Sequence, residues 1–198
     1  MKQIGFIGAF DKIDLILYLA KILVATGKKV LVVDASILQK AKYIVPAINP
    51  TKSYVTEFEE IDVAVGLEDY QSIKQYLGMH EQAEFDYDYI LIDVDNTEMF
   101  NNFNVSASYR NYFVTGVDSY SMKRGLEILS GLTEPIPLTK VIFSKKILQE
   151  EEDYLNYLSL GYKIQWNDDK TYFPFELGDQ TTIFENQRIS KIRLKRLT

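Results

Sequence analysis

The first 34 residues alternate between apolar runs and an apolar-periodic segment, and this alternation constrains the fold more than any other feature of the chain. An apolar run at Ile4–Ile7 is followed by a turn, and apolar residues then recur at helical spacing over Ile13–Val24. Gly27 follows this segment, and a second apolar run, Val30–Val33, ends at Asp34. A strand, a helix and a strand in this order form a βαβ unit, which requires a parallel sheet and a right-handed crossover.

The remaining sequence continues the same alternation. Strands are predicted at Lys2–Ile7, Lys29–Val33, Asp62–Val65, Tyr89–Asp93, Asn111–Val114 and Lys140–Phe143. Helices are predicted at Asp11–Ala25, Asp69–Leu77, Ser121–Leu132, Leu148–Leu158 and Gln180–Glu185. Continuous apolar strands are typical of a sheet covered by helices on both faces. We therefore expect a three-layer α/β/α fold, a mostly parallel, doubly wound sheet in one domain over residues 1–198, with Ile4–Ile7 central and next to Ile90–Ile92.

The turn between the first strand and the first helix has the frame of a phosphate-binding loop without its usual residues. In such loops glycines let backbone N–H groups reach phosphates, a lysine contacts the β- and γ-phosphates, and the next Ser or Thr binds Mg²⁺. Lys12 is in the lysine position, but Asp11 precedes it and Ile13 follows it. The candidate nucleotide-binding loop consists of Gly8, Ala9, Phe10, Asp11, Lys12, Ile13 and Asp14.

This opening resembles the ParA/MinD family of P-loop ATPases (SIMIBI class), whose pattern is KGGVGKTT, an apolar helix and then GKKVLLIDAD. Here GKKVLVVDAS follows the apolar helix, and YDYILIDVDN at Tyr87–Asn96 is similar to the family's YDYIIIDTPP. Weaker similarity extends the resemblance over nearly the whole chain, and it implies a P-loop NTPase-like fold. It places Lys12 on the loop lysine, Asp34 on an acidic residue that helps to position water and metal, and Asp93 on the Walker-B carboxylate.

Most of the family's catalytic signature is replaced. Ile7 occupies the position of its second lysine, Ala9 and Asp11 replace loop glycines, and Ile13 and Asp14 replace the paired Ser/Thr. A carboxylate roughly 4 Å from a bound phosphate costs about 4 kcal/mol at an effective dielectric of about 20. Asp11 is also a suitable N-cap, and Asp14 three residues later resembles the second half of a capping box. We therefore expect the two carboxylates to satisfy the loop amides and to neutralise Lys12.

These replacements predict a degenerate member of the family, a pseudo-ATPase with no cofactor. The alternative is an active enzyme that uses ATP and Mg²⁺, with Lys12, Asp34 and Asp93 as catalytic residues and the two carboxylates at the metal. The absence of cysteine and the single His80 argue against disulfides and against metal sites built on Cys or His.

The net charge of the chain and its distribution indicate which partners and which cellular location to expect. The net charge of −6 argues against broad nucleic-acid binding, and charges near the N-terminus interrupt any signal-peptide core. A cytoplasmic location is expected. Residues 188–198 are an exception, because they form a basic tail containing Arg188, Lys191, Arg193, Lys195 and Arg196. Such a tail either complements the dipole of a last helix or places the protein peripherally on an anionic membrane or on DNA.

The function expected from this reasoning is protein interaction, as a positioning, scaffolding or regulatory factor of a larger assembly. Relatives that lack the ATPase signature include the TadZ/CpaE-like localisation factors, so the resemblance favours a pilus or secretion machine. The alternatives are an active, atypical ATPase of the partitioning type and a DNA- or membrane-tethered adaptor acting through the basic tail. The partner is expected to be another protein or a second copy. Aromatic residues that could supply the apolar contact are Tyr154, Tyr157, Tyr162, Trp166, Tyr172, Phe173 and Phe175.

Overall fold

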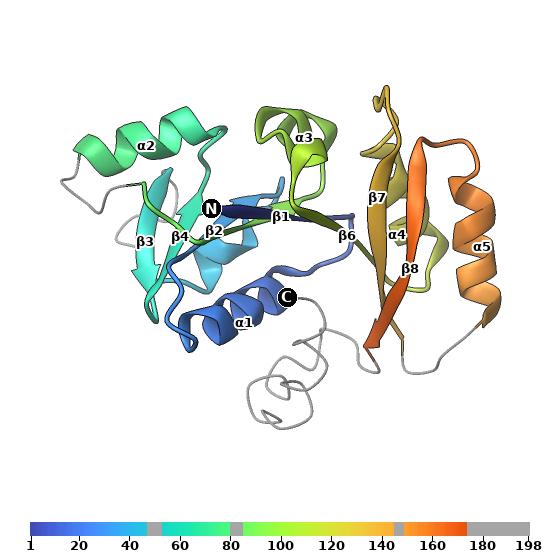
Figure 1. The fold of residues 1–198 in the computed structure, drawn as a ribbon, viewed down its shortest axis with the longest axis horizontal. Helices are drawn as coiled ribbons and strands as arrows, with labels where there is room; N and C mark the ends of the chain where they lie inside the picture. The colour runs from blue at the N-terminus through green and yellow to red at the C-terminus, as the bar shows by residue number, and fades with distance from the viewer. Residues whose placement is uncertain (47–52, 80–84, 145–148, 174–198) are drawn as a thin grey trace.

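The computed structural model describes residues 1–46, 53–79, 85–144 and 149–173 (Figure 1). The strands are β1 (Lys2–Ile7), β2 (Val30–Ala35), β3 (Tyr54–Phe58), β4 (Ile61–Val65), β5 (Tyr89–Val94), β6 (Arg110–Thr115), β7 (Ile136–Phe143) and β8 (Ile164–Phe173). The helices are α1 (Ile13–Val24), α2 (Tyr70–Met79), α3 (Thr97–Asn102), α4 (Ser119–Glu127) and α5 (Gln149–Ser159), with 3₁₀ turns η1 (Lys40–Tyr43) and η2 (Val105–Ala107).

These strands form one eight-stranded sheet in the order β3-β4-β2-β5-β1-β6-β7-β8. Every neighbouring pair is parallel except β3 with β4. The predicted α/β/α class and the mostly parallel sheet are confirmed. The predicted central position of β1 is confirmed too, since β1 lies between β5 and β6. Residues 174–198 lie outside the described residues, so the single domain over 1–198 and the helix at Gln180–Glu185 stay predictions.

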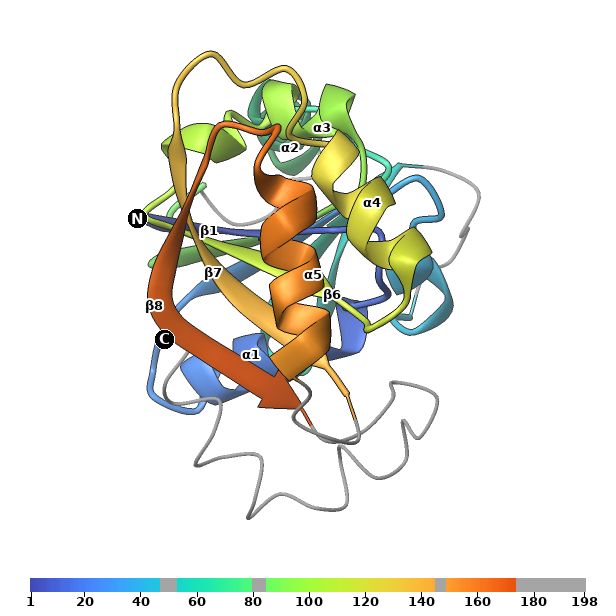
Figure 2. The same cartoon turned by 90° about the vertical axis from the view of Figure 1, so that its right-hand side faces the viewer.

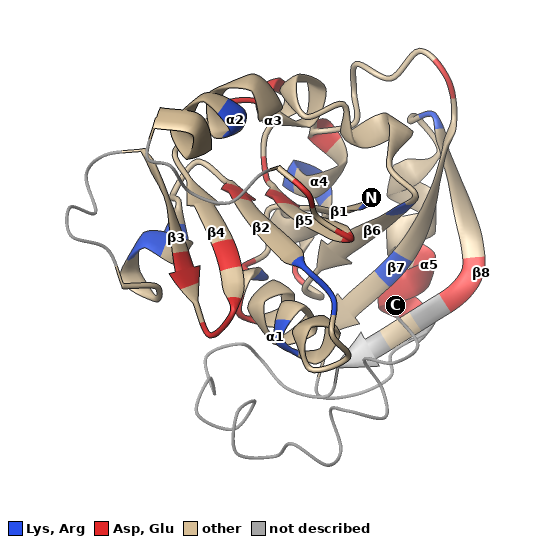
Figure 3. Ribbon diagram, turned by 60° about the vertical axis from the view of Figure 1, so that its left-hand side comes forward, with Lys and Arg blue, Asp and Glu red and all other residues tan. Residues whose placement is uncertain are grey.

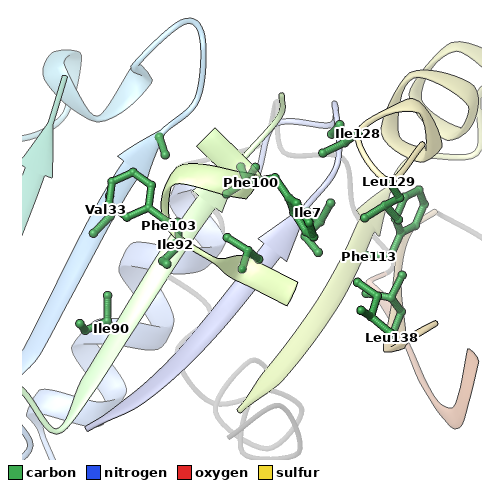
Figure 4. Close-up of a cluster of buried hydrophobic side chains, with 14 of the residues drawn as sticks. Ile7, Val33, Ile90, Ile92, Phe100, Phe103, Phe113, Ile128, Leu129 and Leu138 are labelled. Carbon is green, nitrogen blue, oxygen red and sulfur yellow. The ribbon is translucent and has the colours of Figure 1, made fainter. Parts of the chain in front are cut away.

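Helices cover the two sheet faces unequally. Among the described residues, α1 packs on one face of the sheet, and α2 and α3 lie on the opposite face (Figure 1). Side chains of α2 to α5 join the apolar cluster on that opposite face, part of which is drawn in Figure 4. Alternation within each strand produces the two clusters, as in β1, where Ile4 and Phe6 point toward α1 and Ile7 points away. None of the helices in the described part of the chain is long and apolar enough to cross a membrane.

Several elements were not predicted, namely the edge strands β3 and β8, helix α3 and the two 3₁₀ turns. The edge strand β3 forms a tight hairpin with β4, whose turn residues Glu59 and Glu60 have φ angles of 51° and 64°. Acidic residues gather on this hairpin (Figure 3). Helix α3 begins directly after β5, because Oδ1 of Asn96 accepts a hydrogen bond from the backbone N–H of Met99 at 2.9 Å.

Helix α5 lies against the sheet (Figure 2), and a buried ion pair joins it to β7. Nζ of Lys140 in β7 lies 2.9 Å from Oε1 of Glu152 in α5 and 2.7 Å from Oδ1 of Asn156. The same ammonium lies over the ring of Trp166 in β8. This pairing offsets part of the cost of burying a lysine and a glutamate between a helix and a sheet.

Candidate phosphate-binding site

The loop between β1 and α1 lies at the carboxyl edge of the sheet, where α/β proteins place ligands. Its first residue, Gly8, has a φ of 149° and donates its N–H to the carbonyl of Val94 at 3.0 Å. A Cβ on Gly8 would lie 2.0 Å from the carbonyl oxygen of Val114. Only glycine therefore fits between β5 and β6 at this position.

Lys12 is the N-cap residue of α1, and its side chain turns back into the loop. Nζ donates to the carbonyl of Gly8 at 2.7 Å and lies 2.6 Å from Oδ1 of Asp93 in β5. The side chains of Lys12 and Asp93 are 2% and 5% exposed. Because a buried cation is costly unless it is paired, the Asp93 carboxylate accounts for the position of Lys12.

Asp34 lies beside this pair, since it is the register partner of Asp93 in neighbouring parallel strands. Burial raises the pKa of Asp93 to about 7, an effect that Lys12 opposes and that the Asp34 carboxylate reinforces. Burial likewise raises the pKa of Asp34, against the effect of its hydrogen bonds. The structure thus brings together Lys12, Asp34 and Asp93, the three residues predicted for an active enzyme.

The Asp34 carboxylate organises the segment that follows β2. Its Oδ1 accepts from the backbone N–H and the hydroxyl of Ser36, and its Oδ2 accepts from the N–H of Ala41 at 2.8 Å. Both oxygens are therefore engaged in holding η1 near the loop. No group of three or more acidic, His or Cys side chains within the described residues is arranged to hold a metal ion.

The prediction that Asp11 and Asp14 cap α1 is wrong. The helix begins at Ile13, its N-cap is Lys12, and no described side chain caps it. Asp11 instead forms an ion pair with Lys40 of η1. Asp14 is buried, and its Oδ2 has no hydrogen-bond partner among the described residues. Burial and the Asp11 carboxylate raise the pKa of Asp14, whereas Lys40 lowers it.

The prediction that Asp11 and Asp14 neutralise Lys12 is also wrong, because Asp93 has that role. The error has a physical cause. Capping rules describe contacts within one helical turn. The ion pairs of the charged side chains in this loop instead join it to β5 and η1.

The two isoleucines at signature positions are core residues. Ile13 is buried among the side chains beneath α1. Ile7 is buried in the opposite cluster, near Phe113 (Figure 4). Neither position therefore presents a polar group to the loop.

No family model and no curated protein matches the sequence. Solved structures do match the fold. MinD from Aquifex aeolicus, in its complex with MinC, aligns at a TM-score of 0.61 and 16% identity, covering 100% of this chain and 96% of that chain. The chain has the ParA/MinD fold.

Two further structures with the ParA/MinD fold contain a nucleotide. A plasmid partition protein from Borrelia burgdorferi, bound to AMPPNP, aligns at a TM-score of 0.58 and 15% identity, covering 98% of this chain and 94% of that chain. McdA from Cyanothece, in complex with ATP, aligns at 0.56 and 14% identity, covering 100% and 92%. The prediction of a chain with no cofactor is wrong for this fold, since both of these neighbours hold an adenine nucleotide.

The loop residues fit the phosphates of a nucleotide better than they fit the accompanying metal. Gly8 gives the close backbone turn, and Lys12 places an ammonium within the loop. The hydroxyl that would bind Mg²⁺ is replaced by the buried side chain of Ile13. A metal at this site would depend on the phosphates themselves and on Asp34 and Asp93.

Sequence reasoning missed two contacts of the loop, because both join it to distant segments. The ring of Phe10 stacks on Phe143 at the end of β7, with ring centroids 5.0 Å apart. Lys40 approaches Asp11 from a position 29 residues further along the chain.

A pocket of about 300 Å³ adjoins the site at the ends of β2 and β4, lined in part by Ser36 and Asn96.

The late aromatic residues divide between core and surface. Trp166 packs edge to face against Phe113 at 5.6 Å between ring centroids, and Tyr162 is partly buried. Tyr157 is 70% exposed. Nothing tests the predicted interaction role of these residues, and it stays a prediction. The basic tail at 188–198, with Phe175, lies outside the described residues, so the DNA- or membrane-tethered adaptor also stays a prediction.

Proposed function

We propose that this protein is a positioning or regulatory factor of a larger assembly, that it binds an adenine nucleotide at residues 8–14, and that it turns the nucleotide over slowly at most. The observation that carries the proposal is the position of Lys12. A lysine ammonium is buried within a glycine-initiated loop at the carboxyl edge of a parallel sheet. Polyphosphates bind at such loops through backbone N–H groups and a lysine.

Slow turnover is proposed because the residues that assist hydrolysis are altered. Ile13 has no hydroxyl for Mg²⁺, and Ile7 brings no second lysine to the loop. Asp34 already accepts three hydrogen bonds from Ser36 and Ala41. Phosphoryl transfer depends on positioned cations that stabilise the developing charge, so each alteration lowers the rate.

A protein partner is proposed from the fold and the sequence together. One neighbour of this fold was solved as a complex between MinD and MinC. The resemblance to TadZ/CpaE-like factors favours a pilus or secretion assembly as the context. In this role the nucleotide would stabilise a binding-competent state, and hydrolysis would contribute little.

Phosphate release with saturating Mg-ATP tests the proposal. We expect the unmodified protein to release phosphate at least about tenfold more slowly than its Ile13→Thr variant, which restores a hydroxyl at the metal position. A calorimetric titration checks that both proteins bind ATP. A fast, magnesium-dependent rate in the unmodified protein would instead support the second candidate, an atypical partitioning-type ATPase. That candidate is favoured by the proximity of Lys12, Asp34 and Asp93.

A further inference from the structure

The loop carries more negative than positive charge. Four carboxylates, those of Asp11, Asp14, Asp34 and Asp93, lie in or beside it. The ammonium of Lys12 lies 2.6 Å from one of them. A polyphosphate that enters such a site meets like charge unless a second cation is present.

Lys40 is that second cation. It belongs to η1 and forms an ion pair with Asp11, and its charge also acts on Asp14. Lys40 therefore contacts Asp11 and lies within electrostatic range of Asp14 in the first turn of α1. The side chains of Lys40 and Asp11 are 39% and 29% exposed, in contrast to the buried Lys12.

The position of Lys40 is built into the fold. Ala41, the next residue, donates its N–H to Asp34 at 2.8 Å, and Ser36 donates to the same carboxylate. Gln39, the preceding residue, has a left-handed backbone with a φ of 48° and donates its N–H to the Ser36 hydroxyl at 3.1 Å. The buried carboxylate at the end of β2 thus holds the turn that carries Lys40 against the loop.

We propose that Lys40 is a second phosphate-binding residue of this site, held in place by Asp11. The proposal rests on the proposed nucleotide-binding function and names a ligand contact that the loop sequence does not contain. A lysine ammonium has three donors on a flexible stem. It can therefore keep its bond to Asp11 and also donate to a phosphate oxygen. Asp11, which replaces a loop glycine, acts in this arrangement as an anchor for Lys40.

Calorimetric titrations with ATP and with tripolyphosphate test the proposal. We expect Lys40→Met to weaken the binding of both ligands by about tenfold or more, as expected for the loss of a charge-assisted hydrogen bond. The matched control is Lys42→Met, two residues along the same segment, where the ammonium lies 5.0 Å from the centroid of the Tyr43 ring. The control should bind both ligands within about twofold of the unmodified protein.

The Asp11→Asn background separates phosphate contact from simple neutralisation of Asp11. If Lys40 contacts phosphate, Lys40→Met also weakens ligand binding in that background. An effect of Lys40→Met that disappears in the Asp11→Asn background, or an equal loss in Lys42→Met, would overturn the inference. If the unmodified protein binds neither ATP nor tripolyphosphate, the proposed function fails and the inference fails with it.

Discussion

We expect the carboxyl group of Asp93 to make the stability of the protein depend on pH, and we expect Asp93→Asn to remove its share of that dependence. Asp93 is buried at the end of β5 with Lys12 as its cation. Burial raises its pKa from the ordinary value of 3.8 to about 7, with Lys12 opposing the rise. The folded protein therefore holds a proton on Asp93 at pH values where the unfolded chain has lost it.

The sign and the size of the effect follow from proton linkage. A raised carboxyl pKa gives a stabilising contribution that is complete below 3.8 and is lost as the pH rises through about 7. At 1.36 kcal/mol per unit of pKa, the free energy of unfolding falls by roughly 2 to 3 kcal/mol between about pH 5 and about pH 8 because of Asp93 alone. Asp14 and Asp34 change it in the same direction, since burial raises their pKa values too.

Urea denaturation of the unmodified protein and of Asp93→Asn, at the two ends of this pH range, measures the contribution. We expect the variant to lose roughly 2 to 3 kcal/mol less stability than the unmodified protein as the pH rises. Asp86→Asn is the matched control, because Asp86 is exposed and paired only at the surface with Lys29. Parallel pH profiles for the unmodified protein and Asp93→Asn would refute the reasoning.

Three further sets of substitutions have outcomes set by local geometry. The double substitution Glu59→Asn with Glu60→Gly in the β3–β4 turn should raise the free energy of unfolding by about 1 kcal/mol or more, since both positions have positive φ; an unchanged urea midpoint contradicts this. Lys140→Met should cost about 3 to 5 kcal/mol in the same assay, and adding Glu152→Leu should recover most of it; a double variant no more stable than the single one refutes that pairing. Gly8→Ala should lower the melting temperature markedly in calorimetry, because its Cβ meets a main-chain oxygen at 2.0 Å; an unaltered melting temperature contradicts the geometry.

The fold was predictable because its main signals are local and periodic. Continuous apolar runs such as Val30–Val33 identify central parallel strands, and the pattern at Ile13–Val24 identifies a helix. Elements without strong periodicity were missed. The strand Tyr54–Phe58 is short and lies at a sheet edge, and α3 is a short helix that starts from a single N-cap, Asn96.

The candidate site was predictable only in part. The sequence identified Lys12, Asp34 and Asp93, because each lies at the end of a strand or at the start of a helix, where a parallel sheet brings such residues together. It assigned the wrong partners within the loop, since the Asp11–Lys40 pair depends on where η1 lies relative to α1. A contact between segments 29 residues apart follows from the folded chain and not from helix-capping rules.

We propose above all that this protein binds nucleotide phosphates at the loop around Lys12. Calorimetric titration of ATP into the unmodified protein and into Lys12→Met tests it most directly, with far-ultraviolet circular dichroism to show that both proteins are folded. We expect saturable binding to the unmodified protein and a loss of at least about tenfold in affinity in Lys12→Met. Equal affinity in the two folded proteins, or no binding to the unmodified protein, would contradict it.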